Sequence, residues 1–441
     1  VGFVAAFGQQ GLFNDLLRAL GLPTLRLMYT LKIIVLAHAF YNAPLVTRIT
    51  AAAWESIDTR TVETARSLGA SPWQAFRHVI VPQLLPSILT GALLTFVFTF
   101  LSFAIVLALG GLKYATIEVW VYRSVQNLEY HTAAALASFE TVFSLLLMYA
   151  YLRYEATQRA YRATRNRSRI NLLGPITGRR VAVGGYCLVV IVVFVVPIVS
   201  MVIESFTSSG GLTLRNYAFL LERQTTAFAF QIKPLTAVRN SLLFGATTLL
   251  FAVPMGILVA ILSTRQYMGR KIVDAIAMAP LAVSGIVVGL GLLRGLVFGF
   301  ELFGHRIRMA GAVAIVAAHA VAAYPFVTRN VAPQLASLDR QLAETARSLG
   351  ASRIRAFIDV ELPLVFSGVL AGAAFAVAIS MGEFDSTVIL ATNTNSYTMP
   401  IAIERFLGRR LGPATAMGCV LLVVTSASFL IVDKVGGRYH G

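Results

Sequence analysis

The sequence has few charged residues and almost no cysteine, and these shortages exclude several protein classes. Only 13% of its 441 residues are charged, whereas 57% are hydrophobic, so the chain lacks the polar surface of a soluble domain. Cys187 and Cys419 lie in apolar runs without CxxC or Cys/His spacing, which indicates neither a metal site nor a disulfide framework. No GxxxxGK phosphate loop and no catalytic constellation is present. We therefore expect no enzymatic activity, no metal and no cofactor bound by this chain.

Acidic residues are also scarce, with 20 Asp and Glu against 37 Lys and Arg and a net charge of +17. Such an excess can indicate nucleic-acid binding, but here the arginines are dispersed over the ends of apolar runs and lack an aromatic base-stacking pattern. Membrane topology explains them, because short basic loops stay on the cytoplasmic side. We therefore expect no nucleic-acid partner.

Long apolar runs predict a polytopic membrane protein. About 20 apolar residues are needed for a helix to cross the hydrocarbon layer, and the period-2 alternation of a transmembrane barrel is absent. The predicted fold class is an all-α membrane protein, a polytopic helical bundle whose spans contact lipid. The nine predicted spans are Ile33–Trp54, Leu84–Leu109, Ala133–Leu152, Val181–Ile203, Asn240–Leu262, Ile272–Val297, Met309–Val331, Leu364–Ala391 and Pro413–Val432.

A nine-residue string is repeated without change. It occupies Glu63–Ser71 and Glu344–Ser352, an offset of 344 − 63 = 281, and the same offset pairs His38 with His319. Internal repeats of this kind are typical of membrane transport proteins. The chain is predicted to contain a first domain at 1–154, a basic linker at 155–180 and a second domain at 181–441.

The two domains are unequal in their number of predicted spans. Three spans fall in the first domain and six in the second, which begins near Val181. Its counterpart would begin near 181 − 281 = −100, about 100 residues before Val1. We therefore expect the first domain to be truncated at its N-terminus and the intact protein to have twelve spans.

Charge placement predicts the orientation in the cell membrane. The densest basic segment is the linker at 155–180, and basic loops are retained in the cytoplasm. Threading the spans from a cytoplasmic linker places both repeated loops on the cytoplasmic side. The chain is thus expected to be a multi-pass protein of the plasma or inner membrane.

Each repeated loop has the local signals of a compact pair of helices. Glu63 is expected in the first turn of a helix, Gly69 permits a left-handed stop, Pro72 suits the start of a second helix and Pro82 ends the loop. Glu344, Gly350 and Pro363 repeat this pattern, with Arg353 in place of Pro72. Two short helices at an angle would form a knob on the membrane face. The simplest alternative is a capped surface helix with a glycine stop.

These loops resemble the signature cytoplasmic loop of the permease subunits of binding-protein-dependent ABC importers, of type I. That loop begins Glu-Ala-Ala, has Gly four residues later and ends near Leu-Pro, and the matching residues here carry Thr in place of the first Ala. The resemblance implies a permease of an ATP-driven importer, two separate ATPase subunits that hydrolyse the ATP, and an extracytoplasmic substrate-binding protein. The implied ATPase-coupling residues are Glu63, Ala65, Gly69, Pro82, Glu344, Ala346, Gly350 and Pro363.

The presence of both domains in one chain is similar to the fused permeases of the ferric-iron and thiamine group. The stretch from Phe100–Ala104 through Leu109–Gly111, followed by Ala115–Tyr122, is similar to their outer gate region. This resemblance implies transport of iron(III) or thiamine, with molybdate, sulfate and polyamines open. A secondary transporter or channel working without an ATPase, and an exporter or scaffold, are the alternatives.

Two acids lie within the predicted span Leu364–Ala391. Glu383 and Asp385 align at the repeat offset with Ser102 and Ala104. A carboxylate at membrane depth is costly and usually faces a cavity or a partner. We expect Glu383, Asp385 and Ser102 to line or gate the translocation path, with Arg294 or Ser102 as partner of the acids; a helix–helix hydrogen bond is the alternative.

The segment between the last two predicted spans alternates apolar and charged residues. Within Tyr397–Leu411 these charges are Glu404, Arg405, Arg409 and Arg410. Such a pattern predicts a short amphipathic helix along the outer surface, a candidate contact for the binding protein. A solvated loop is the alternative.

Overall fold

The computed structural model describes residues 1–111, 113–158, 178–208, 211–222, 233–265, 267 and 269–437. The chain forms two compact units. We call the first the amino-terminal unit, made of Ala6–Val119 and Ser138–Ser200, and the second the carboxyl-terminal unit, made of Val1–Ala5, Trp120–Ala137 and the chain from Met201 onward. Most of the basic linker predicted at 155–180 lies outside the described residues.

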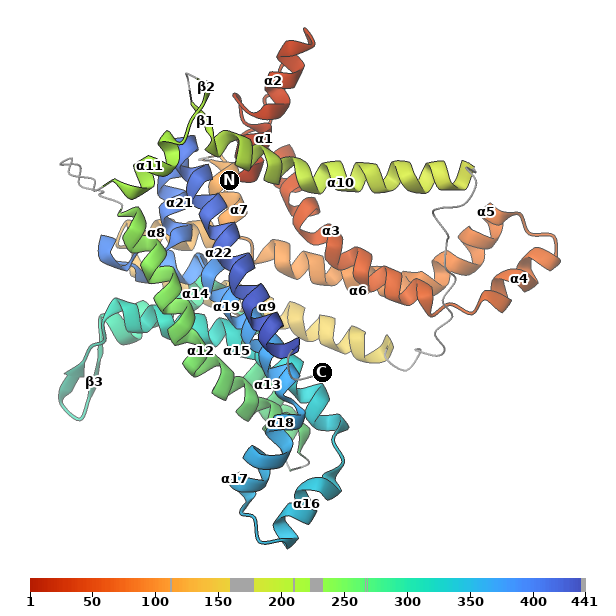
Figure 1. The fold of residues 1–441 in the computed structure, drawn as a ribbon, viewed down its shortest axis with the longest axis vertical. Helices are drawn as coiled ribbons and strands as arrows, with labels where there is room; N and C mark the ends of the chain where they lie inside the picture. Colours follow the sequence, from red (N-terminus) through yellow and green to blue (C-terminus); the bar gives the residue numbers. More distant parts are fainter. Residues whose placement is uncertain are drawn as a thin grey trace. The chain divides into compact units, whose positions relative to one another are not determined.

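Helices dominate both units, as predicted (Figure 1). The helices in the first 205 residues are α1 (Gly2–Phe7), α2 (Leu12–Ala19), α3 (Leu31–Glu55), α4 (Thr59–Ser67), α5 (Pro72–Ala75), α6 (Val81–Phe100), α7 (Ala104–Gly110), α8 (Ile117–Gln126), α9 (Tyr130–Gln158) and α10 (Gly178–Ser205). The later helices are α11 (Arg215–Leu221), α12 (Pro234–Thr264), α13 (Arg270–Met278), α14 (Gly285–Leu292), α15 (Gly311–Ser337), α16 (Arg340–Ser348), α17 (Arg353–Ala356), α18 (Leu362–Leu364), α19 (Phe366–Gly382), α20 (Asp385–Leu390), α21 (Met399–Leu407) and α22 (Leu411–Gly437).

Shorter elements join these helices. Two antiparallel hairpins pair β1 (Thr207–Ser208) with β2 (Gly211–Leu212) and β3 (Phe300–Leu302) with β4 (His305–Ile307). Turns of 3₁₀-helix occupy Ala279–Ala282 and Thr394–Ser396, and π-helical turns occupy Phe76–Ile80, Leu293–Val297 and Phe357–Glu361. The π turn at Phe76–Ile80 ends two residues before Pro82, which has no N–H to continue the α-helical hydrogen bonds.

Seven described helices are long and apolar enough to cross a membrane, or up to nine spans if each of two bent helix pairs is counted as one. These correspond in position to the nine predicted runs. Three predicted runs are not continuous helices. The run Ile272–Val297 bends by 100° between Ala282 and Gly285, the run Leu84–Leu109 is interrupted between Phe100 and Ala104, and the run Leu364–Ala391 is interrupted between Gly382 and Asp385. A further bend, of 77°, lies at Val365, where α18 meets α19 at the start of the last of these runs. At the first bend the Ser284 hydroxyl caps α14 by accepting a hydrogen bond from Val287 N at 3.3 Å. Hydropathy does not reveal such bends because both arms are apolar.

The sequence repeat is reproduced as repeated local structure. Helices α4 and α16 begin and end 281 positions apart, and so do α5 and α17 and the two π turns that follow them. Further along, α7 and α20 begin at this offset, as do α9 and α22. The two copies differ after the π turn, because α6 continues without a break to Phe100 whereas α18 ends at Leu364 and the chain bends into α19.

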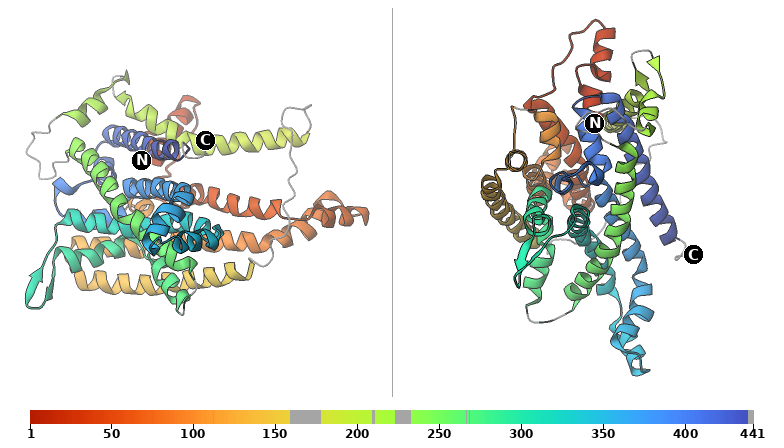
Figure 2. Two further views of the ribbon diagram at one scale, coloured as in Figure 1. Left: turned by 60° about the horizontal axis from the view of Figure 1, so that its bottom comes forward. Right: turned by 90° about the vertical axis from the view of Figure 1, so that its left-hand side faces the viewer.

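The carboxyl-terminal unit is built around α12, α15 and α19, with α22 packed on α19 and α21 on α22 (Figures 1 and 2). Small residues bring these helices close together. A Cβ atom at Gly372 of α19 would lie 2.8 Å from the Val327 Cα of α15. One buried core joins α12, α15 and α19 through Val327, Val331 and Val369, among others.

Each repeated loop lies at one end of a long helix. The 27-residue helix α15 is about 40 Å long and joins the β3–β4 hairpin to α16, so hairpin and loop lie at opposite ends of the carboxyl-terminal unit. Figure 1 shows α16 and α17 projecting beyond the ends of α12 and α15. In the amino-terminal unit, α3 separates α2 from α4 in the same way.

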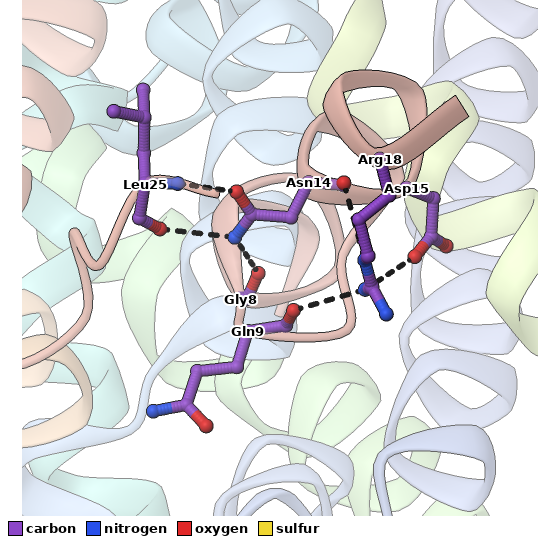
Figure 3. Close-up of polar contacts among 6 residues, drawn as sticks. All are labelled: Gly8, Gln9, Asn14, Asp15, Arg18 and Leu25. Atoms are coloured by element: carbon purple, nitrogen blue, oxygen red, sulfur yellow. Dashed lines mark hydrogen bonds and ion pairs between the residues drawn. The ribbon is translucent and has the colours of Figure 1, made fainter. Parts of the chain in front are cut away.

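The segment that precedes α3 is held by one asparagine (Figure 3). Asn14 is 2% exposed; its Nδ2 donates to Gly8 O at 2.8 Å and Leu25 O at 3.0 Å, and its Oδ1 accepts from Leu25 N at 2.8 Å. Arg18 donates to Gln9 O at 3.2 Å and pairs with Asp15 at 2.6 Å. This segment is therefore fixed at the end of the unit opposite to α4.

Candidate functional site

The first repeated loop is closed by side-chain caps and a left-handed glycine. Asp58 accepts a hydrogen bond from Arg60 N at 3.0 Å and so begins α4. At the other end Gly69 has φ 92°. Gly69 N donates to Arg66 O and Ala70 N donates to Ala65 O, at 3.0 and 3.1 Å. This is the Schellman motif, in which a residue without Cβ reverses the chain at low cost.

The second repeated loop has the same geometry. Asp339 accepts from Gln341 N at 3.0 Å, and Gly350 has φ 94°. Gly350 N donates to Arg347 O and Ala351 N to Ala346 O, both at 3.0 Å. Gly69 and Gly350 are therefore structurally required, and Ala65 and Ala346 supply the carbonyl groups that close the turn.

A serine then starts the next helix in both copies. The Ser71 hydroxyl accepts from Gln74 N at 3.2 Å while Gln74 Oε1 accepts from Ser71 N at 2.8 Å, a reciprocal capping box. Ser352 accepts from Arg355 N at 3.2 Å in the second copy. Arg355 has no side-chain acceptor to complete the box.

Two details of the predicted loop were wrong. Glu63 is the fifth residue of α4 and not part of its first turn, and the acid at the helix start is the cap Asp58. Glu344 and Asp339 stand in the same relation in α16. Pro82 does not end the loop, because α5, the π turn and α6 form one helical segment from Pro72 to Phe100. A proline is tolerated at the start of α6, where its missing N–H costs little.

The most exposed apolar side chains of these loops were not among the residues predicted to be functional. Leu68 and Leu349 are each 84% exposed, and at the next matched position Trp73 and Ile354 are 66% and 73% exposed. The repeated string already contained the signal, a leucine between polar residues and a glycine stop. Large apolar side chains presented at matching places outside the spans are typical of protein contact surfaces.

The predicted gate acids lie at a helix break and not inside a continuous span. Glu383 directly follows α19, and Asp385 is the first residue of α20. Glu383 Oε1 accepts from Ser386 N at 3.0 Å and from the Ser386 hydroxyl at 2.8 Å. The carboxylate therefore satisfies the exposed N–H groups at the start of α20, as an N-cap does.

The predicted pairing of these acids with Arg294 is wrong in the part of the chain that the structure describes. The Arg294 guanidinium lies over the Tyr130 ring at 5.3 Å and the Phe298 ring at 6.0 Å. Close to the acids lies α14 instead: a Cβ atom at Gly285 would be 2.8 Å from Asp385 Cβ and 3.1 Å from Glu383 Oε1. Backbone packing, not an ion pair, surrounds the break.

Ser102 occupies the matching break of the first repeat. Helix α6 ends at Phe100 and α7 begins at Ala104, 281 positions before Asp385. The Ser102 carbonyl accepts from the Thr116 hydroxyl at 3.4 Å. Both repeats thus contain a break at the same place, and Ser102 belongs to the amino-terminal unit whereas Glu383 belongs to the carboxyl-terminal unit.

The amphipathic segment near the C-terminus is packed inside the carboxyl-terminal unit. Met399, Ala402 and Phe406 of α21 belong to a buried core that also contains Leu220 and Met417. The predicted short helix is present as α21, in place of the alternative loop, and its apolar face is covered by protein.

Glu404 projects from α21 beside Arg405. The two side chains lie 3.6 Å apart, and each is 31% exposed. Burial raises the pKa of the Glu404 carboxyl, and the neighbouring Arg405 opposes this shift.

Residues 12–158 and 252–440, which include both repeated loops and both breaks, match the family described as "Binding-protein-dependent transport system inner membrane component". The chain belongs to this permease family. It is therefore a transmembrane subunit of an ABC importer, a multi-pass protein of the inner membrane whose transport depends on a binding protein.

Similar permeases fall into two groups by the length that they match. The ferric transport system permease protein FbpB of Actinobacillus pleuropneumoniae is 23% identical over 99% of this chain and 63% of its own length. The thiamine transport system permease protein ThiP of Haemophilus influenzae is 26% identical over 96% of this chain and 76% of its own. The molybdenum transport system permease protein ModB of Haemophilus influenzae is 28% identical over 45% of this chain and 92% of its own.

Proposed function

We propose that this permease couples ATP hydrolysis in two separate ATPase subunits, one docked on each repeated loop, to import of a small solute. ATP acts only through those subunits, and the chain itself carries out no bond chemistry. The observation that carries this proposal is the pair of loops with the same caps, the same left-handed glycine and the same exposed leucine, 281 positions apart.

The shape of the loops supports a docking role. Each loop is preorganised by a capping aspartate, a Schellman turn and a capping serine, so little conformational entropy is lost on binding. Leu68 and Leu349 would insert into a pocket of the partner, with Trp73 and Ile354 beside them. Because the repeats are alike, two copies of one ATPase would fit, one per loop.

Coupling would pass through the helix that follows each loop. In the first repeat the helical segment from Pro72 to Phe100 joins the loop directly to the break that contains Ser102. In the second, α17 and α18 lead through the bend at Val365 into α19, which ends at Glu383. A force on either loop would thus reach a break, where Glu383, Asp385 and Ser102 would line or gate the path.

The remaining parts of the machine follow from this arrangement. The repeated loops and the linker at 155–180 would face the cytoplasm, and the binding protein would deliver substrate to the opposite face. Residues 1–154 and 181–441 would form the two transmembrane domains, surrounded by lipid.

For the substrate we propose iron(III) or thiamine. The relatives that match nearly the whole chain, with both repeats, are the ferric and thiamine permeases, whereas the molybdenum permease matches less than half of it. A match that extends over both repeats supports membership of the fused ferric-iron and thiamine permeases.

The proposal is tested by reconstituting the permease in proteoliposomes with the ATPase and the binding protein encoded beside it. We expect uptake of radioactive iron(III) or thiamine that requires ATP and stops with a non-hydrolysable analogue. Molybdate serves as the comparison substrate. Uptake that proceeds without the ATPase would instead establish a channel or secondary transporter and overturn the proposal.

A further inference from the structure

A buried histidine joins four helices of the carboxyl-terminal unit. His319 of α15 is 0% exposed. Its Nδ1 lies 2.7 Å from Ser380 Oγ of α19, and its Nε2 lies 2.8 Å from Thr387 Oγ1 of α20. Thr248 Oγ1 of α12 lies 3.3 Å from Ser380 Oγ. One imidazole ring therefore bonds to residues on both sides of the break at Glu383.

The hydroxyl groups determine which ring nitrogen carries the proton. Thr387 Oγ1 donates to Glu383 O at 3.1 Å, so it accepts from the N–H at Nε2. Nδ1 lies within hydrogen-bond distance of Ser380 Oγ, and the Ser380 hydroxyl also contacts Thr248 Oγ1. Both ring nitrogens therefore have a hydroxyl partner. Removing either hydroxyl would leave a buried ring nitrogen without its bond, which is more costly than the bond itself.

Helix α20 packs closely against α14. A Cβ atom at Gly289 of α14 would lie 2.9 Å from Ser386 O and 3.2 Å from Ile389 Cβ, so the two backbones are in direct contact. Helix α14 follows the 100° bend and α20 follows the break, so both are short segments with a change of direction at one end. The bond from Thr387 to His319 ties this pair to the long helix α15.

The first repeat keeps the histidine but not its partner. His38 Nδ1 lies 2.8 Å from Ile34 O of its own helix, and among the described residues His38 Nε2 has no hydrogen-bond partner. The position that matches Thr387 is Val106, which has no hydroxyl. The sequence repeat therefore supplies two histidines, but the tie across the break exists in the second repeat only.

We propose that His319 is a positioning residue of transport. It holds α20, and with it Glu383 that caps this helix, in a fixed place against α15, and its bond to Thr387 must break when the second repeat opens the path. This role rests on the proposed import function. The bond from His319 to Thr387 makes the two repeats unequal. It holds α20 against α15 in the second repeat, whereas Val106, at the matching position of the first repeat, has no hydroxyl to form such a bond.

The test measures substrate molecules transported per ATP hydrolysed in the complete reconstituted complex. Thr387→Val removes the hydroxyl and keeps the side-chain shape, whereas Thr387→Ser keeps the hydroxyl. We expect Thr387→Val to lower the coupling ratio about fivefold to tenfold or more, because it removes the hydroxyl that bonds to His319 Nε2 and donates to Glu383 O. Thr387→Ser should keep a ratio near wild type, and so should the matched control His38→Asn in the first repeat.

The possible outcomes separate this role from the import function. A purely structural role would lower the unfolding temperature of Thr387→Val without changing the coupling ratio, and that result would overturn the proposal for His319. An equal loss of coupling in His38→Asn would also overturn it. A wild-type complex without ATP-dependent transport would overturn the import function, and the role of His319 with it.

Discussion

Leu68 and Leu349 are exposed to the same degree, 84% each, although they lie 281 positions apart in two separate units. Each follows a nine-residue helix and directly precedes a glycine with positive φ. Both leucines are thus held at the tip of a rigid turn, and apolar side chains exposed at matching places are typical of a contact surface.

The first prediction concerns these two leucines. The double variant Leu68→Ser, Leu349→Ser should lose most of the ATPase that purifies with the chain, because two anchors of the docking surface are removed. Each single variant should retain part of it. Leu212→Ser in the β1–β2 hairpin is the matched control, since Leu212 is 86% exposed but lies outside the loops. Equal recovery of ATPase in all four proteins would contradict a docking role.

The second prediction separates backbone conformation from contact at the glycines. No atom lies within 4 Å of a Cβ placed at Gly69 or Gly350, so alanine there meets no steric clash. It does meet the left-handed conformation, which costs about 1–2 kcal/mol for a residue with Cβ. We expect Gly69→Ala with Gly350→Ala to reduce ATP-dependent uptake more than the corresponding asparagine pair, because asparagine tolerates positive φ. The reverse order would show that the turn is not the determining feature.

The third prediction tests the charge of Glu383. In Glu383→Gln the amide oxygen can still accept from Ser386 N, so the cap of α20 is kept while the negative charge is lost. If the charge lines the path, uptake should fall about tenfold or more with little change in unfolding temperature. Asp385→Asn should act in the same direction. Transport and coupled ATP hydrolysis equal to wild type in Glu383→Gln would remove the gate hypothesis.

The fourth prediction concerns pH and Glu404, whose folded-state pKa is raised by burial. The folded state then favours the protonated acid, so the stability associated with this group is present below the usual pKa of 4.5 and is lost as pH rises through the higher folded value. Glu404→Gln cannot ionise. Its unfolding temperature should exceed that of wild type by about 2 °C or more at pH 8.

The difference in unfolding temperature between Glu404→Gln and wild type should shrink toward zero near pH 4. Thermal unfolding followed by intrinsic fluorescence between pH 4 and pH 8 measures it. Arg405 opposes the rise in the pKa of Glu404. Arg405→Gln in a protein that keeps Glu404 should therefore enlarge the pH dependence of the unfolding temperature. A wild-type protein that gains stability relative to Glu404→Gln as pH rises would contradict the sign.

Local signals in the sequence were sufficient for the loops. Gly69 before Ala70 and Ser71 before Pro72 specify a turn and a cap through neighbours in the chain, and both copies adopt them. The error at Glu63 arose because α4 begins four residues earlier, at Thr59, where Asp58 provides the cap. The first residue of a helix is hard to fix from sequence.

The break at Glu383 could not be read in the same way. Apolar residues continue on both sides of it, and nothing in the local pattern separates an acid inside a span from an acid that caps a new helix. Ser386, Gly285 and the distant His319 determine that arrangement, and the last two are remote from Glu383 in sequence. The covered face of α21 is a similar case, because Leu220 and Met417 meet it from other helices.

By itself the sequence determined that this chain is a duplicated helical membrane protein with two alike loops, because hydrophobic length, repetition and turn chemistry act between near neighbours. Only the tertiary structure decided where the spans bend, which helix Glu383 caps and which of two repeated histidines is tied across a break. The histidine tie depends on hydrogen bonds between residues 61 or more positions apart, and no local pattern encodes it.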